Sequence, residues 1–460
     1  MKTGSQCTKP FDINQGVRQG CVLSPLLFNI FLADLAKDLD EMDDKIEIGA
    51  HSLNSIFWAD DILMFAKDKD TLQIMLSKLE NYAKENKLEI NTEKTQTMIM
   101  NKTGRLMRRP FYINGKLLQS VRTYKYLGFQ ITPSGELGTG LKDLKDRALR
   151  AYLKIKSDMG HSFMQDVHTS LQLIDFLVKP IMTYNSDFWG CMKLPKNDPI
   201  ENLQMKMYKD LLGVHKTTTN KGVLLELGRI PIRPYVVKNA VKNWERIRKG
   251  EANEPLVASF HDAKVNDLPW INGIRMTLEN NDMLHFYTEE FPDRPSFIYT
   301  KIFQSLSDQF NQEALESIKA QGSKLRTYST FKTTKGFEQY LMDIKNVDIR
   351  RQVTKFRLSN HQLKIETGRH DRIPEEIRIC PLCEDGIENE LHFLLTCPTY
   401  SPIRTTFFEH ILHLIPDFHE LEELQKFTSI MTNLDNTAAK FIRDCFELRT
   451  FLLAEHKIND

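Results

Sequence analysis

Residues 55–65 read SIFWADDILMF, a short apolar and aromatic run, two adjacent aspartates and a second short apolar run. This pattern predicts a strand, a tight turn and a returning strand. Because successive residues of a strand face opposite sides, Asp60 and Asp61 can serve one site only if the chain turns there. Two carboxylates held at such a tip repel each other unless a divalent cation lies between them and substrate phosphates, as Mg²⁺ does in phosphoryl-transfer sites. The alternative is a solvated Asp-Asp turn.

Further elements are predicted on both sides of this hairpin. In chain order they are a helix over residues 24–39 begun by Ser24 and Pro25, the hairpin itself, a helix opened by a capping box of Asp70 and Gln73, a strand over residues 95–101, a hairpin at Asn114-Gly115, and a strand-like run over residues 124–131. Helices and strands in this order predict an α+β layer, in which an antiparallel sheet is backed by helices.

Composition limits the kinds of partner and compartment. Lys and Arg total 62 and Asp and Glu total 61, which gives a formal charge of +1, so a nucleic-acid partner must be met by local basic patches. The seven cysteines do not form the pattern of a secreted disulfide framework, and a reducing compartment fits them better. No signal-peptide core and no run near the roughly 18 apolar residues of a membrane span is present. We therefore expect an intracellular protein, nuclear or cytoplasmic, that is neither secreted nor membrane-bound.

Four motifs follow one another within about 120 residues. They are VRQGCVLSPLLFNIFL at 17–32, WADD at 58–61, LEINTEKTQTM at 88–98 and YKYLG at 124–128. In this order they resemble the Arg-Gln-Gly and Leu-Ser-Pro motif, the catalytic Ala-Asp-Asp motif, the Lys-Thr motif and the primer grip of the non-LTR retrotransposon reverse transcriptases, which are RNA-directed DNA polymerases. The ordered set is far more specific than any one motif.

The resemblance implies a role for each motif. Asp60 and Asp61 would bind the catalytic Mg²⁺ (or Mn²⁺), and Lys94 would protonate the leaving pyrophosphate. The positions implied to border the incoming nucleotide and the template are Arg18, Gln19, Gly20 and Ser24, and those implied to support the primer end are Tyr126, Leu127 and Gly128. Taken singly, each has an ordinary alternative: a solvated lysine, a turn that leads into a helix, and a core strand.

Two departures from the family pattern bear on activity. Trp58 stands where the family usually has Tyr or Phe. The family's first catalytic aspartate lies in a strand well upstream of the Arg-Gln-Gly stretch, and the one acidic residue before Arg18 is Asp12, whose place matches the approach to that stretch. Two-metal phosphoryl transfer needs ligands that clamp both the attacking and the leaving oxygen. We therefore expect polymerase ancestry with little or no polymerase activity in the isolated chain.

Residues 138–160 have the periodicity of a helix with one apolar side and a modestly basic remainder. By the resemblance this is the position of a thumb, whose Lys145, Arg150 and Lys154 would lie on duplex backbone without reading sequence. The alternative is a solvated helix face. Residues 250–340 are mostly helical by pattern, and no function is assigned to them.

The C-terminal part contains Cys380-x2-Cys383-x8-His392-x4-Cys397. Four such ligands within 18 residues suit a tetrahedral structural Zn²⁺, and the alternative is a set of free buried cysteines with a core histidine. The segment from Arg350 to Arg372, which precedes these cysteines, has a local charge of +5. The surrounding sequence resembles the CCHC zinc segment of the same retrotransposons, which implies contact with template RNA or target DNA phosphate through Arg350, Arg351, Lys355, Arg357, Lys364 and Arg369.

Together these features predict an α+β fold with four parts: a partial reverse transcriptase palm (1–133), a thumb with a helical extension (134–250), a helical connector (251–340) and a basic segment with a CCHC zinc module and C-terminal helices (341–460). The predicted function is a fragment of a retrotransposon reverse transcriptase that acts on an RNA template, a DNA target or primer and, if active, dNTPs. The rival hypothesis is a non-catalytic nucleic-acid-binding protein derived from a retroelement, and a weaker third one is a pseudogene product.

Overall fold

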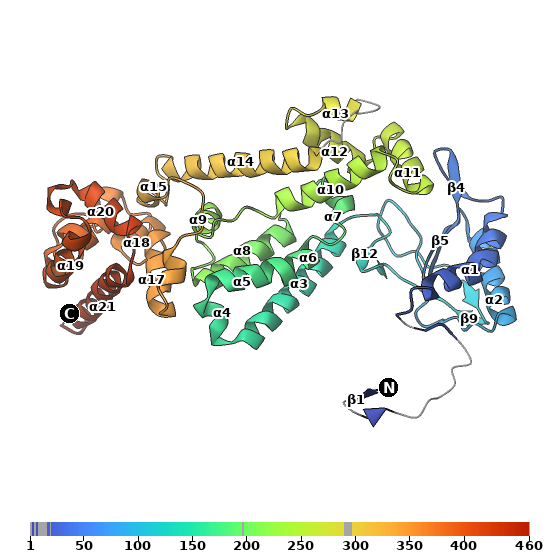
Figure 1. Cartoon of the computed structure of the whole chain (residues 1–460), viewed down its shortest axis with the longest axis horizontal. Coiled ribbons are helices and arrows are strands. Elements are labelled where there is room, and N and C mark those ends of the chain that lie inside the picture. Colours follow the sequence, from blue (N-terminus) through green and yellow to red (C-terminus); the bar gives the residue numbers. More distant parts are fainter. Residues whose placement is uncertain are drawn as a thin grey trace. The chain divides into compact units, whose positions relative to one another are not determined.

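The computed structural model describes residues 2–3, 6–7, 16–18, 20–195, 197–288 and 297–459. Asp12 and Gln19, both considered above, lie outside the described residues. The chain forms two compact units (Figure 1). Unit 1 comprises residues 1–136 and 247–268, and unit 2 comprises residues 137–246 and 269–460. The predicted boundary after residue 133 lies close to this division, and the boundaries after 250 and 340 stay predictions.

Unit 1 combines helices with short strands, as an α+β fold requires. Its elements are β1 (Lys2–Thr3), β2 (Gln6–Cys7), α1 (Ser24–Asp40), β3 (Ile46–Ile48), β4 (His51–Leu53), β5 (Ser55–Trp58), β6 (Asp61–Met64), α2 (Lys69–Glu85), β7 (Gln96–Thr97), β8 (Tyr112–Ile113), β9 (Lys116–Leu117), β10 (Gln119–Ser120), β11 (Tyr124–Tyr126), β12 (Phe129–Ile131) and α11 (Glu254–Val265).

The predicted single antiparallel sheet is not what these strands form. Where the structure is described, strands pair only in twos: five antiparallel ladders, and one parallel ladder of β7 with β10. The strands are only two to four residues long, so each ladder is short. The run over 124–131, expected as one strand, is likewise two strands joined by Leu127 and Gly128.

The core of unit 1 lies between the predicted helices. Leu32, Leu35 and Leu39 of α1 pack with Met75 and Tyr82 of α2, all at most 8% exposed. The Tyr82 hydroxyl donates to the main-chain oxygen of Phe31, which fixes one helix on the other. This packing confirms the helical periodicity of both segments.

The start of α2 differs from the prediction. Asp68 is the residue that caps the helix, because its carboxylate accepts the main-chain N–H groups of Asp70 and Thr71. The Gln73 side chain, expected in a capping box, exchanges hydrogen bonds with the main chain of Tyr112 in β8. Gln73 therefore joins a helix to a hairpin that is distant in sequence. That hairpin turns at Asn114-Gly115, as predicted, with φ of 51° and 69° at the two residues.

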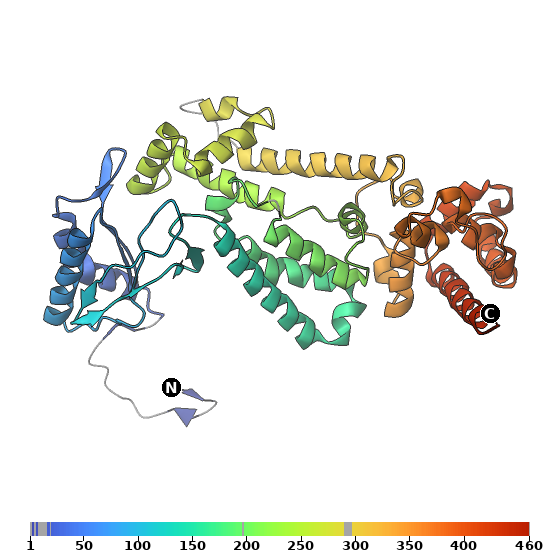
Figure 2. The same cartoon turned by 180° about the vertical axis from the view of Figure 1, so that it is seen from behind.

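Unit 2 is helical (Figures 1 and 2). Its helices are α3 (Gly138–Met159), α4 (His161–Gln165), α5 (Val167–Leu173), the π-helix η1 (Ile174–Val178), α6 (Lys179–Met182), α7 (Ser186–Trp189), α8 (Pro199–Leu212), α9 (Asn220–Glu226), most of α10 (Arg233–Arg248), α12 (Pro269–Glu279), α13 (His285–Thr288), α14 (Ile298–Lys319), α15 (Tyr328–Phe331), α16 (Tyr340–Asp343), α17 (Val347–Arg357), α18 (Lys364–His370), η2 (Glu375–Ile377), η3 (His392–Thr396), η4 (Pro398–Tyr400), α19 (Ser401–Leu414), η5 (Phe418–Glu420), α20 (Glu423–Thr432) and α21 (Asn436–Asn459).

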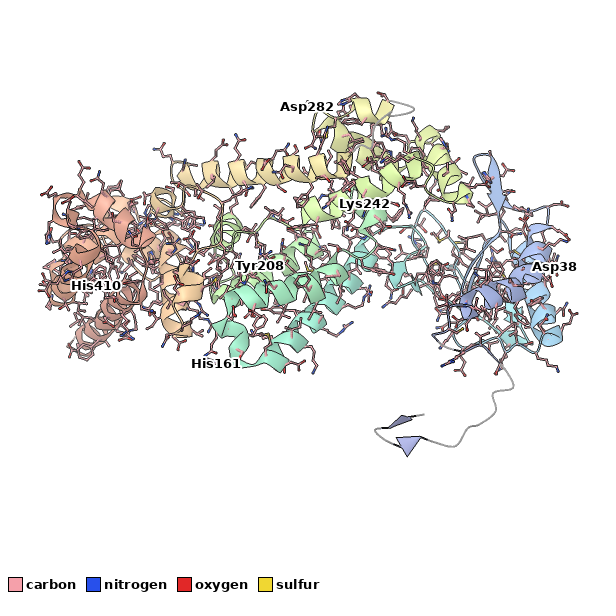
Figure 3. The ribbon with its side chains drawn as sticks, viewed as in Figure 1. Asp38, His161, Tyr208, Lys242, Asp282 and His410 are labelled. Carbon is pink, nitrogen blue, oxygen red and sulfur yellow. The ribbon has the colours of Figure 1, made fainter. Side chains whose placement is uncertain are left out.

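Two helices of unit 2 confirm their sequence patterns closely. α3 buries Leu141, Leu144 and Tyr152 on the predicted side. α8 begins with Asp198 as a capping residue and ends at Gly213, whose φ is 68°. Its Tyr208 is only 4% exposed and lies among the side chains that fill the interior (Figure 3).

A buried group of charges joins distant parts of unit 2. Glu226, at the end of α9, is fully buried and pairs with Arg357 of α17 at 2.7 Å. The hydroxyls of Tyr328 and Tyr340 donate to the same carboxylate at 2.7 and 2.6 Å. Arg357 also contacts Glu338 and donates to the main-chain oxygen of Met431. Each buried charge in this group thus has partners, as burial demands.

Across the described residues, the helices lack a segment that is both apolar enough and long enough to cross a lipid bilayer.

Candidate catalytic hairpin and metal centre

The two aspartates lie at the tip of a tight hairpin. β5 and β6 pair antiparallel, with Ser55 opposite Met64 and Trp58 opposite Asp61. Ala59 and Asp60 are therefore the two residues of the loop, and Asp61 is the first residue of the returning strand. Ala59 has a φ of 51°, a conformation that is uncommon for a residue with a Cβ atom. The predicted strand-turn-strand is confirmed.

The hairpin is held by its inner face and leaves its outer face open. Phe57 and Ile62, a cross-strand pair, pack against the core of α1 and α2. The side chain of Asn54 is buried and donates to the main-chain oxygen of Leu39, at the end of α1. Because side chains alternate along a strand, the next pair, Trp58 and Asp61, faces away from this core. The Trp58 side chain is 63% exposed, so the core does not have to accommodate this larger ring.

A second hairpin lies within electrostatic reach of Asp61. Burial raises the pKa values of Tyr124 and Tyr126 in β11, and the negative charge of Asp61 raises both further. The Tyr126 hydroxyl is buried and has no hydrogen-bond partner among the described residues. The WADD and YKYLG motifs, more than 60 residues apart in sequence, therefore lie within electrostatic reach of each other in the fold.

The proximity of Tyr124 to Asp61 was not foreseen from the sequence. Tyr124 and Tyr126 are two residues apart and therefore share one face of their strand. This spacing was the sequence signal that the two tyrosines face the same site. At the tip of this second hairpin Leu127 and Gly128 have φ of 43° and 82°. Both hairpins of the site thus carry a non-glycine residue in the left-handed region, a feature found often at functional turns.

The hairpin tip supplies only part of a metal site by itself. Asp60 and Asp61 are exposed carboxylates, which suit a hard cation such as Mg²⁺. No group of three or more potential ligands that includes them occurs in the part of the chain that the structure describes. Their exposure leaves room for water or substrate oxygens to complete the coordination of an ion.

The other residues expected in the catalytic site lie at the surface of unit 1. Arg18 and Gly20 are exposed, and Gly20 has a φ of 80° that favours glycine. Ser24 is buried and its hydroxyl donates to the main-chain oxygen of Arg18 at 2.7 Å, which ties the Arg-Gln-Gly stretch to α1. Lys94 is exposed in a turn, where its main-chain N–H donates to Asn91. Among the described contacts, no hydrogen bond or ion pair joins the Lys94 side chain to the hairpin tip.

The C-terminal cysteines form a compact cluster. The ligand atoms of Cys380, Cys383, His392 and Cys397 all lie within 4.8 Å of one another. Cys383 Sγ and His392 Nε2 are 3.3 Å apart. The first two cysteines lie on a knuckle, in which the Cys380 N–H donates to the oxygen of Gly386. His392 is the first residue of the π-helix η3, and Cys397 follows its last residue.

These four residues fit tetrahedral Zn²⁺. Zinc bonds of about 2.0–2.3 Å place neighbouring ligand atoms roughly 3.5–3.8 Å apart, so ligand atoms that all lie within 4.8 Å of one another need to approach by at most about 1 Å to bind the ion. The Nδ1 atom of His392 lies 3.2 Å from the Thr396 hydroxyl, which leaves Nε2 to face the cysteines. Burial raises the pKa of Cys380 to about 12 and that of Cys397 as well, and it lowers the pKa of His392. A bound cation would offset the cost of ionising these buried thiols.

The basic segment before the cysteines divides into buried and exposed residues. Arg350 is 3% exposed and donates to the main-chain oxygens of Gln165, Ile344 and Met164. Arg357 is 2% exposed and holds the carboxylates described above. For these two residues the prediction of phosphate contact is wrong, because their guanidinium groups are already bound inside the protein. Lys355 and Lys364 are exposed and Arg351 and Arg369 are partly exposed, so their assignment stays a prediction.

The predicted basic face of α3 is open but largely paired. Arg150 and Lys154 are exposed, and Lys154 forms an ion pair with Asp158 at 2.7 Å. Lys145 is partly exposed and lies 3.6 Å from Asp146. Exposed pairs of this kind contribute little to stability and exchange easily with other anions. The contact of this face with nucleic acid stays a prediction.

Comparison with known proteins places the N-terminal motifs in one family. Residues 2–131 match the family described as reverse transcriptase (RNA-dependent DNA polymerase). The chain is 30% identical over 123 residues to the retrovirus-related Pol polyprotein from type-1 retrotransposable element R2 of Nasonia vitripennis. This match covers 25% of the present chain and 12% of the polyprotein. It is 29% identical over 131 residues to the retrovirus-related Pol polyprotein from type-2 retrotransposable element R2DM of Drosophila melanogaster. That match covers 27% of the present chain and 12% of the polyprotein.

A longer match reaches beyond the N-terminal motifs. The chain is 24% identical over 242 residues to the RNA-directed DNA polymerase from mobile element jockey of Drosophila funebris, which covers 51% of this chain and 26% of that polymerase. The matched segments thus span between 12% and 26% of the length of these three relatives.

Proposed function

Because residues 2–131 belong to the reverse transcriptases, of the kind found in non-LTR retrotransposons, we propose that unit 1 is part of the palm of an RNA-directed DNA polymerase. The observation that supports this most directly is the tip of the β5–β6 hairpin. It presents Asp60 and Asp61 on a rigid support, within electrostatic reach of the tyrosines of β11. Metal-binding carboxylates beside a second fixed hairpin suit a site that positions phosphate groups.

In this proposal Asp60 and Asp61 hold Mg²⁺ or Mn²⁺, which neutralises charge on the phosphates during nucleotidyl transfer. Lys94, in the turn between α2 and β7, is the proton donor for the leaving group. Arg18, Gln19, Gly20 and Ser24 border the nucleotide and the template. Tyr126, Leu127 and Gly128 support the primer end, at a tight turn in which Leu127 has a φ of 43°.

One carboxylate pair cannot by itself clamp both reacting oxygens. The described residues bring no third acidic ligand to Asp60 and Asp61, so a further ligand is needed for a complete two-metal site. We therefore propose that the 460-residue chain, tested alone, binds a divalent ion weakly and incorporates few nucleotides or none.

The C-terminal part of unit 2 has a different proposed role. Cys380, Cys383, His392 and Cys397 hold one structural Zn²⁺ with no open position. Around it, Lys355, Lys364, Arg351 and Arg369 contact the phosphates of template RNA or target DNA, and Lys145, Arg150 and Lys154 of α3 contact the duplex as a thumb does. These contacts depend on charge, so we expect them to weaken steeply with salt.

The palm assignment is tested with the purified chain. Mn²⁺ binding is measured by electron paramagnetic resonance for the wild type and for Asp60→Asn, Asp61→Asn and Asp43→Asn. Asp43 is an exposed aspartate of the same unit and serves as the control. We expect about tenfold weaker binding in the first two variants and no change in the third. Equal Mn²⁺ binding in all four proteins would remove Asp60 and Asp61 from the proposed metal site.

Activity is measured in parallel by extension of an oligo(dT) primer on poly(rA) with Mg²⁺. We expect little incorporation, and robust incorporation that Asp60→Ala abolishes would overturn the proposed incompleteness. The rival function, a binding protein without catalysis, predicts RNA binding that survives in Asp60→Asn. Fluorescence anisotropy with labelled RNA at two salt concentrations measures that binding.

A further inference from the structure

The charge of the proposed zinc centre requires a counter-charge. Zn²⁺ with three thiolates and one neutral imidazole carries a net charge of −1. Cys380 and Cys397 are at most 1% exposed, so most of this charge would lie away from water. A buried net charge is costly unless a group of opposite sign lies beside it. The neighbourhood of the cysteines should therefore contain a buried cation that no carboxylate already neutralises.

Arg404 has the properties of that cation. It lies on α19, seven residues after Cys397, and is 8% exposed. Its Nη2 donates to the main-chain oxygen of Cys397 at 2.7 Å, and its Nε donates to that of Leu394 at 2.8 Å. Within the described segments no carboxylate forms an ion pair with it. Arg449, also buried in this region, differs because Glu388 binds it through both carboxylate oxygens at 2.7 and 2.9 Å.

Thiols lie within electrostatic reach of Arg404. Burial lowers the pKa of Arg404, and negative charge on Cys445 and Cys397 acts in the opposite direction. Cys445 is fully buried in α21, which packs against α19. The guanidinium group contacts the main chain of one of the four ligands directly, and its helix packs against the helix that carries a further buried cysteine.

We propose that Arg404 supplies the counter-charge of the zinc-bound thiolates. It is a positioning residue, since it does not bind the metal. The inference rests on the proposed zinc site and adds the group that stabilises the negative charge of this site. It also explains why a cation that forms no ion pair within the described residues is buried beside these cysteines.

A purely structural role for Arg404 is the competing explanation. Arg350 is also buried, and it donates only to main-chain oxygens near the ends of α4 and α16. Arg404 binds two main-chain oxygens near the end of η3 in the same manner, so helix capping alone accounts for its hydrogen bonds. The two explanations differ in the charge, because capping needs donors and the zinc centre needs a cation.

The test uses the whole chain as the wild type and as Arg404→Gln, Arg404→Lys and Arg350→Gln. Zinc content is measured by mass spectrometry, and zinc affinity is measured by chelator competition. The thiolate-to-cobalt charge-transfer band is recorded by absorption spectroscopy after Co²⁺ has replaced Zn²⁺. Gln keeps a donor but loses the charge, whereas Lys keeps the charge. Arg350→Gln controls for loss of a buried arginine that lies apart from the cysteines in sequence.

We expect Arg404→Gln to weaken zinc binding about tenfold or more and to move the cobalt band to lower energy, because the thiolate electrons lose a stabilising positive charge. Arg404→Lys should stay within about threefold of the wild type. Arg350→Gln should lower the melting temperature and leave affinity and band unchanged.

The outcomes separate this inference from the zinc site itself. A wild-type chain with well under one zinc refutes the site and the inference with it. A wild type that holds zinc, with Arg404→Gln unchanged or Arg404→Lys equally weak, overturns the counter-charge alone. If Arg404→Gln does not fold, Arg404→Lys decides: zinc affinity within about threefold of the wild type supports the inference, and weaker binding overturns it.

Discussion

The two candidate metal sites of this chain are built in opposite ways. At the β5–β6 hairpin the carboxylates of Asp60 and Asp61 are exposed, and few groups surround them. At the C-terminus four ligands lie within 4.8 Å of one another, two of them fully or almost fully buried. An open site leaves coordination positions for substrate oxygens, whereas a closed one serves to hold the chain together. The contrast indicates that exposed ligands are typical of a metal site that acts on substrate, and that buried ligands are typical of a metal site that stabilises the fold.

The comparison predicts that loss of a cysteine ligand has the largest effect on stability. Cys397→Ser should abolish stoichiometric zinc and unfold the region around η3, because zinc binding contributes about 10–16 kcal/mol in small zinc modules. Metal analysis and thermal melting measure the change. Cys191→Ser, which alters a buried cysteine outside the cluster, should retain full zinc content. Equal metal loss in both variants would contradict the assigned ligand set.

Removal of a buried charge should have the next largest effect. Arg357→Met leaves Glu226 buried without its cation and should cost about 3–5 kcal/mol of the free energy of unfolding. Lys355→Met, on the exposed side of the same helix, should change that free energy by at most about 0.5 kcal/mol. Chemical denaturation measures both. Similar effects of the two variants would show that burial does not separate the residues of the basic segment.

The same carboxylate gives stability a pH dependence. Burial alone would raise the pKa of Glu226, but Arg357 and the two tyrosine hydroxyls outweigh it and hold this pKa below its ordinary value. A lowered folded-state pKa means that the contribution is complete above the unfolded value of about 4.3 and is lost as pH falls through the lower folded value. Glu226→Gln should therefore flatten the acid side of the stability curve. A curve with the wild-type slope below pH 4 would rule this group out as its source.

The smallest effect is expected at the exposed tip. Ala59 has a φ of 51°, so Ala59→Gly should relieve backbone strain and raise the free energy of unfolding by at most about 1 kcal/mol. Ala33→Gly, in the exposed middle of α1, should lower it by about the same amount. Thermal melting of both variants checks the opposite signs. A loss of stability in Ala59→Gly would mean that the turn is not strained.

Local patterns predicted the local structures well. The turn at Asp60, the Asn114-Gly115 hairpin and the grouping of the cysteines each depend on neighbouring residues or on ligand spacing, and the structure contains them. The α+β class and the helical course of α3 and α8 also follow from periodicity. In these cases the residues that determine the structure are close together in sequence.

Features that depend on distant partners were missed or misassigned. The sequence presents Arg357 as one more cation of a basic run, and only folding brings Glu226, 131 residues away, to its guanidinium group. In the same way, nothing near Tyr124 in the sequence announces Asp61. Charge runs therefore predict surfaces poorly when some of their members are bound by residues far along the chain.

The Glu226–Arg357 pair sets a rule for dividing this protein into shorter recombinant pieces. A fragment that starts at residue 341 would retain Arg357 but discard Glu226, Glu338 and Tyr340, its partners on the other side of the cut. Such a piece would carry an orphaned guanidinium in its interior and should aggregate or be degraded during expression, even with zinc supplied. A fragment that begins just before α9 keeps both Glu226 and Glu338 with Arg357. Such a fragment is therefore the better starting point for isolating the cysteine module.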